Sequence, residues 1–125
     1  MERMWVAAGG VAGCTAVAMA AAAAHALSHR LDPRALEAVR SAVQMQGWHA
    51  IALVLVGIWL GRRLGSSAAL LANLAGAAFA LGVLLFCGSV YAGELAGIRI
   101  GPTALVGGIL LMAGWLLLAA SALRA

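Results

Sequence analysis

Residues 68–91 read AALLANLAGAAFALGVLLFCGSVY, a run of 24 positions without one charged side chain. An α-helix rises about 1.5 Å per residue, so about 20 apolar residues cross the hydrocarbon layer of a bilayer, which is about 30 Å thick. A strand of a membrane barrel would alternate polar and apolar residues. Residues 81–86 and 109–118 are instead apolar on every face. The run therefore predicts a membrane-spanning helix.

Three other apolar stretches accompany this one, and the few charged residues fall between them. Hydrophobic residues make up 65% of the chain and charged residues 10%. Because backbone groups in lipid must pair within their own element, helices are the expected structure. We predict an all-α integral membrane protein, a single domain of residues 1–125 folded as a four-helix bundle. The expected helices cover about residues 5–27, 45–61, 68–91 and 103–123.

The only substantial polar region lies between the first two of these helices. It contains Asp32-Pro33, an N-cap acceptor followed by proline at the first helical position. Apolar residues then recur at spacings of three and four, at Leu36, Val39 and Val43. This pattern predicts a short amphipathic helix over about 33–44, which lies at the lipid headgroups and leads into the second membrane helix. A dedicated partner-binding surface is the alternative.

The N-terminus also allows a second interpretation. Arg3, the apolar run that follows it and the triplet Ala24-His25-Ala26 resemble a secretory signal with its cleavage site. The run is longer than the core of a usual signal, which favours a retained first helix.

Charge and composition indicate where the protein works. The net charge is +4, and all eight basic residues are arginines that lie near helix ends. Such a distribution does not indicate nucleic-acid binding, and membrane lipids are the expected partners. The arginine- and alanine-rich composition is associated with bacteria, so we expect a multi-pass protein of the inner membrane. Four arginines fall on each side, but Arg62-Arg63 concentrate two in one short loop, which favours cytoplasmic termini.

Polar residues gather at one end of the predicted bundle. With an even number of helices, the end of helix one, the start of helix two, the end of helix three and the start of helix four share one membrane face. That face would hold His25 and His49 together with a polar cluster of Gln46, Ser89, Tyr91, Glu94 and Arg99. Because such groups are costly inside a membrane, their gathering is a site hypothesis. His25 and His49 could ligate a metal or haem iron or relay protons. Histidines near helix ends more often bond to a backbone carbonyl, a neighbouring side chain or headgroup water, which is the favoured interpretation.

Small residues predict where helices approach one another. Gly9 and Gly13 are four residues apart on the first helix, as are Gly57 and Gly61 on the second. Such spacing lets backbones pack closely in lipid. Asn73 is expected to add a hydrogen bond between helices.

Five short segments carry a resemblance to a known family. Those segments are AHAL at 24–27, QGWHAIAL at 46–53, FCGSVY at 86–91 and GG at 107–108, followed by GWLLL at 114–118. In kind and order they resemble the uncharacterised YgdD-like inner-membrane family over nearly the whole chain. Departures from the family's usual residues occur at Ala26, Met45, Trp48 and Cys87, and a family proline just before Gly107 is absent. The resemblance implies a small four-helix membrane protein of unknown activity.

Three functional hypotheses follow. No phosphate-binding loop, His-Glu-x-x-His or Cys-x-x-Cys motif occurs, so we expect no enzyme and name no cofactor. The favoured hypothesis is a non-enzymatic accessory or structural component of a membrane complex, with other subunits or copies of itself as partners. The alternatives are a metal, haem or proton site at His25 and His49, and a small transporter. A transporter of cations generally needs a membrane-embedded acid, and Glu94 lies only near a boundary.

Overall fold

Four long helices and one short turn of 3₁₀-helix make up the protein. The structure, a computed structural model, describes residues 1–125. The elements are α1 (Glu2–Ala24), the 3₁₀ turn η1 (Leu27–His29), α2 (Pro33–Leu60), α3 (Ser66–Ala96) and α4 (Thr103–Arg124). All four long helices are long and apolar enough to cross a membrane, and the chain has no strands. The predicted all-α, four-helix membrane fold is confirmed.

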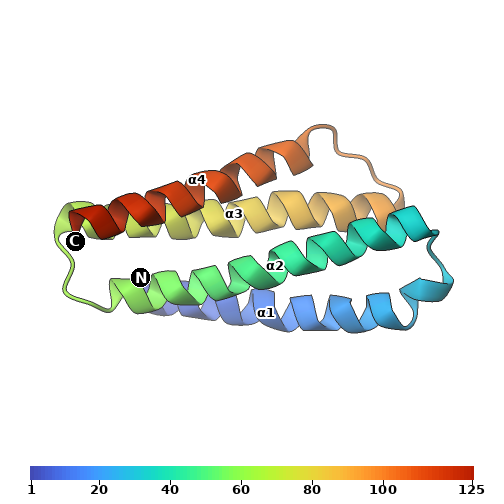
Figure 1. The fold of residues 1–125 in the computed structure, drawn as a ribbon, viewed down its shortest axis with the longest axis horizontal. Coiled ribbons are helices and arrows are strands. Elements are labelled where there is room, and N and C mark those ends of the chain that lie inside the picture. Colours follow the sequence, from blue (N-terminus) through green and yellow to red (C-terminus); the bar gives the residue numbers. More distant parts are fainter.

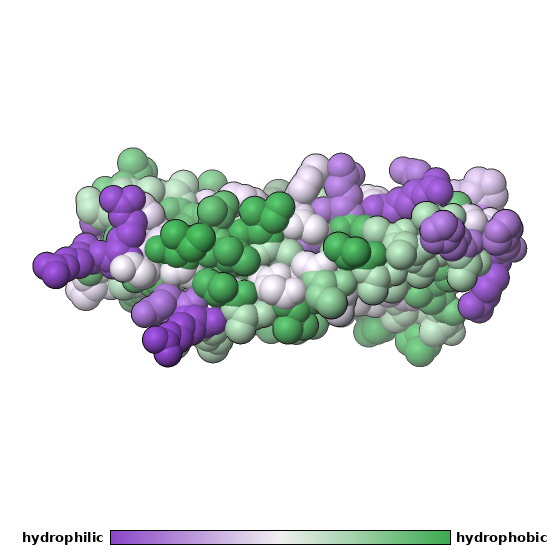
Figure 2. Space-filling view, turned by 90° about the horizontal axis from the view of Figure 1, so that it is seen from below, coloured by the Kyte–Doolittle hydropathy of each residue, from purple (hydrophilic) through white to green (hydrophobic).

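The helices run up and down side by side, in the order of the sequence (Figure 1). Both termini and the α2–α3 turn lie at one end of the rod, and the α1–α2 and α3–α4 connections lie at the other. On the face seen in Figure 2, hydrophilic side chains lie mainly towards the two ends, and much of the surface between them is hydrophobic. This arrangement suits a molecule whose middle faces lipid.

The amphipathic segment 33–44 and the expected membrane helix 45–61 form one continuous helix, α2. Its start is as predicted: the Asp32 carboxylate accepts a hydrogen bond from the Ala35 backbone N–H at 2.8 Å, and Pro33 is the first helical residue. The segment is part of the bundle, because Val39 and Ala42 are fully buried. Val39 packs with Ala23 and Leu27 at the end of α1. Its apolar face therefore meets other helices, and the segment leads into the second membrane helix as expected.

Other helix ends also differ from the sequence-based bounds. α1 ends at Ala24, and α3 extends to Ala96, where Gly97 takes a left-handed conformation with φ of 70°. An L residue with a side chain rarely adopts this conformation, so the glycine ends the helix.

Glycines set the close approach of neighbouring helices. A Cβ atom on Gly9 would lie 2.6 Å from the Ala50 carbonyl oxygen, and one on Gly57 would lie 2.6 Å from the Glu2 carbonyl oxygen. These two members of the predicted glycine faces therefore form the α1–α2 contact. At the α3–α4 contact, a Cβ on Gly107 would meet the Gly82 carbonyl oxygen at 2.9 Å.

The core lies on α2 and α3, which α1 and α4 flank. In the most apolar windows of α2 and α3, 39% of the residues are buried, against 17% in those of α1 and α4. Phe79 and Leu53 are the largest fully buried side chains. The outer helices thus expose most of their apolar surface, and lipid is the solvent that makes such exposure favourable.

Candidate functional site

His49 lies in the middle of α2 and is almost completely buried, with 3% of its surface exposed. Its Nδ1 atom is 2.6 Å from the Met45 carbonyl oxygen, and its Nε2 atom accepts the indole N–H of Trp115 at 3.0 Å. Because a carbonyl only accepts, Nδ1 must carry the proton. The ring also contacts Phe79, with 5.5 Å between ring centroids. Both nitrogens of this imidazole are therefore used inside the protein.

His25 occupies a different level of the bundle. It caps the C-terminus of α1 and is exposed. His49 lies at about the same height along the bundle as Gly9, because Ala50, the next residue after His49, packs against Gly9. Gly9 and His25 are separated by 16 positions of the chain, which corresponds to about 24 Å along a helix. The structure therefore does not bring the two imidazoles together, because α2 starts at Pro33 and carries His49 deep into the bundle. His29, in the 3₁₀ turn, is also exposed.

Gln46 joins three helices near the middle of the rod. Its Nε2 group donates to the Ala12 carbonyl oxygen at 3.0 Å and to Thr15 Oγ1 at 2.6 Å. Its Oε1 atom accepts the hydroxyl hydrogen of Tyr91 at 2.7 Å. The structure thus brings together Gln46 and Tyr91 of the predicted polar cluster. Thr15 was missed, because a lone threonine in an apolar helix usually bonds to its own backbone, as this one also does.

The other members of the predicted polar cluster lie elsewhere. Glu94 pairs with Arg34 at 3.2 Å and with Arg99 at 3.5 Å, at the end of the rod that holds the α3–α4 connection. Ser89 accepts a hydrogen bond from Thr103 at 3.4 Å, between α3 and α4. The five residues therefore form three separate groups, because successive polar positions on a helix point in different directions.

Further buried polar contacts tie the helices together. Trp5 donates its indole N–H to Asn73 at 3.0 Å, which confirms the predicted role of Asn73. Trp59 donates to Ser121 at 2.9 Å, and Ser121 donates to the Ala68 carbonyl oxygen at 2.7 Å. No buried side-chain nitrogen or oxygen is left without a partner.

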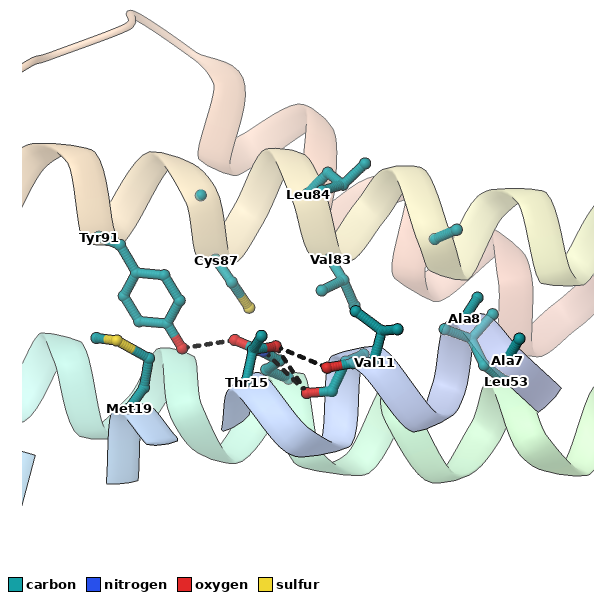
Figure 3. Close-up of a pocket in the computed structure, with 14 residues that line it drawn as sticks. Ala7, Ala8, Val11, Thr15, Met19, Leu53, Val83, Leu84, Cys87 and Tyr91 are labelled. Atoms are coloured by element: carbon teal, nitrogen blue, oxygen red, sulfur yellow. Dashed lines mark hydrogen bonds between the residues drawn. The ribbon is translucent and has the colours of Figure 1, made fainter. Parts of the chain in front are cut away.

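A groove opens between α1 and α3, with α2 as its floor (Figure 3). Its volume is about 670 Å³, and 11 of its 14 lining residues are hydrophobic. Many of them are small, among them Ala7, Ala8, Ala80 and Gly88. The polar side chains at the groove are those of Thr15 and Gln46, which lie beside the hydroxyl of Tyr91. The groove is thus an apolar space with a single polar spot.

Comparisons with known proteins agree with this architecture. Residues 19–108 match the family model described as protein of unknown function DUF423. A UPF0382 membrane protein of Staphylococcus haemolyticus, SH2409, is 31% identical over 98% of this chain and 97% of its own length. A UPF0382 membrane protein of Haemophilus influenzae is 34% identical over 87% of this chain and 85% of its own length. No solved structure matches. The chain therefore belongs to the DUF423 family of proteins of unknown function, its relatives are named membrane proteins, and its own four spans make it a multi-pass bacterial membrane protein.

Proposed function

We propose that this protein is a non-enzymatic accessory subunit of a larger assembly in the bacterial inner membrane. The observation that carries the proposal is the use of its deep polar groups. His49, Gln46 and Ser121 each form a hydrogen bond to another helix of the same chain, and the second nitrogen of His49 bonds to the Met45 carbonyl oxygen of its own helix. Groups held in this way stabilise a bundle, whereas catalytic acids and bases must be free to exchange a proton with a substrate.

The outer surface supports the same proposal. α1 and α4 expose long apolar side chains in the middle of the rod, among them Val17 at 71% and Leu116 at 72%. In a membrane such faces contact either lipid or the helices of another protein. Small residues beside them, such as Gly10, leave room for a second helix to approach.

The transporter alternative has less support. Cation exporters need an acid that can take up and release its ion within the membrane. Glu94 is the most buried acid of the chain, but it already pairs with Arg34 and Arg99 at the end of the rod.

We further propose that both termini lie in the cytoplasm and that the chain is one of the YgdD-like proteins. Arg62 and Arg63 share the five-residue connection between α2 and α3, on the side of both termini. Basic residues concentrated in a short loop favour its retention in the cytoplasm.

Native mass spectrometry after mild extraction from the membrane tests the accessory role. We expect a complex heavier than the single chain of 12.6 kDa. The variants Val17→Ala and Leu116→Ala shorten side chains on the outer surface without touching the core, so at least one of them should release the chain from the complex. A wild-type protein that leaves the membrane only as the single chain would contradict the proposal.

A further inference from the structure

Large side chains lie near both ends of the groove between α1 and α3. At one end Trp5 crosses from α1 to α3, where its indole bonds to Asn73 and its ring packs on Gly76. At the other end Tyr91 reaches down from α3 and Met19 rises from α1 to meet it (Figure 3). The space between them opens sideways, towards the surrounding lipid.

The dimensions of the groove suit a chain-like small molecule. Its lining on α1 runs from Ala7 to Met19, which corresponds to a length of about 18 Å. A partner helix that crosses the bilayer is about 30 Å long and would extend beyond the ends of the groove. The volume of about 670 Å³ lies within the usual range for ligand pockets, about 300–1,000 Å³.

The polar spot in the groove has hydrogen-bond acceptors to spare but no free donor. Both N–H groups of Gln46 are used, on Ala12 and Thr15. The Thr15 hydroxyl donates to the Val11 carbonyl oxygen, and the Tyr91 hydroxyl donates to Gln46. Each of the three side-chain oxygens still has a lone pair available, since each accepts at most one hydrogen bond here. A ligand group that pairs with this spot must therefore bring its own hydrogen.

From these features we propose that the groove binds a neutral lipid alcohol, a single hydrocarbon chain whose hydroxyl donates to the Thr15–Gln46–Tyr91 spot. The chain would lie along α1 and α3 against Ala8, Val83 and Leu84. A carboxylate or phosphate offers acceptors only, and no cationic side chain lines the groove to balance its charge. An ester or ether likewise lacks the hydrogen that the spot requires. This proposal does not depend on the accessory role above, because the groove lies within one chain.

Photoaffinity labelling of the purified protein in phosphatidylcholine nanodiscs tests the proposal. The probes are a decanol with a diazirine in its chain, whose length matches the part of the groove between Thr15 and Ala7, and the methyl ether of the same molecule. We expect the alcohol to label groove residues of α1 and α3 about fivefold more than the ether does, the ratio that one hydrogen bond supports. Equal labelling by the two probes would show that the groove only samples bulk hydrocarbon and would overturn the proposal.

Two glycine substitutions provide a matched pair for the same experiment. Gly88 lines the groove and Gly10 does not, and a Cβ on either has no neighbour within 4 Å. Gly88→Leu should therefore fill the groove and abolish labelling by the alcohol, while Gly10→Leu should preserve it. Persistent labelling of the groove in Gly88→Leu, or its loss in both variants, would overturn the proposal.

A third variant tests the polar spot itself. Thr15→Val keeps the shape of the side chain, removes an acceptor and frees one N–H of Gln46. The alcohol should then lose its advantage over the ether, since the ether oxygen can accept the freed N–H. An unchanged preference would overturn the role assigned to the hydroxyl.

Discussion

Trp115 on α4 donates its indole N–H to Nε2 of His49 on α2, with 3.0 Å between the two nitrogens. The bond joins two helices that are not neighbours in the row of Figure 1. It also fixes the proton of His49 on Nδ1, which faces the Met45 carbonyl oxygen. The histidine that the sequence marks as a candidate ligand is therefore a structural link between helices.

Replacement of His49 should destabilise the bundle. His49→Ala removes both hydrogen bonds of the ring and its contact with Phe79, so we expect a loss of about 2 kcal/mol of unfolding free energy. Thermal unfolding in detergent micelles measures it. His29→Ala, at an exposed position, should leave the midpoint unchanged. Equal tolerance of the two substitutions would contradict the structural role of His49.

Replacement of Gly107 should separate α3 from α4. In Gly107→Ala the new methyl group meets the backbone of Phe86 and Gly82, which cannot rotate away. We therefore expect the free energy of unfolding to fall by about 2 kcal/mol. Gly108→Ala is the control, because its nearest neighbour would be a side-chain atom of Phe86 at 3.8 Å. In the same thermal unfolding assay, Gly107→Ala should have a much lower midpoint than Gly108→Ala. Similar midpoints for both would contradict the close approach seen here.

Ser121 offers a test of the buried hydrogen bonds near the termini. Ser121→Ala removes the acceptor of the Trp59 indole and the donor to the Ala68 carbonyl oxygen. The free energy of unfolding should fall by about 1 kcal/mol, as for other hydrogen bonds between membrane helices. Ser41→Ala on the exposed face of α2 is the matched control and should have no effect. Trp59 fluorescence should shift only in the first variant.

Labelling with a membrane-impermeant maleimide tests the orientation. Arg63→Cys lies in the α2–α3 turn and Arg30→Cys in the α1–α2 connection, at opposite ends of the rod. With cytoplasmic termini, spheroplasts should label Arg30→Cys at once and Arg63→Cys only after permeabilisation. The wild-type chain, with its two native cysteines, gives the background. The reverse pattern would place the termini outside.

The sequence alone determined that lipid surrounds the protein, that it has four long helices, and which helix ends lie on the same side of the membrane. Transfer of apolar residues into lipid is nearly additive along a segment, so the uncharged run 68–91 identifies a span without knowledge of its neighbours. The Asp32-Pro33 start could also be read directly, because an N-cap is a local interaction.

Only the tertiary structure decided which side chains meet. The contacts of Gln46 with Thr15 and Tyr91 join residues 31 and 45 positions apart, and their pairing depends on the rotation and depth of three helices. The sequence placed His49 near the start of the second membrane span, whereas the burial of Val39 and Ala42 makes the preceding segment part of the bundle, and His49 lies in the middle of α2. The groove could not be predicted from the sequence either. It is a space that small side chains leave between helices, and hydropathy is a property of single residues that does not describe how helices pack.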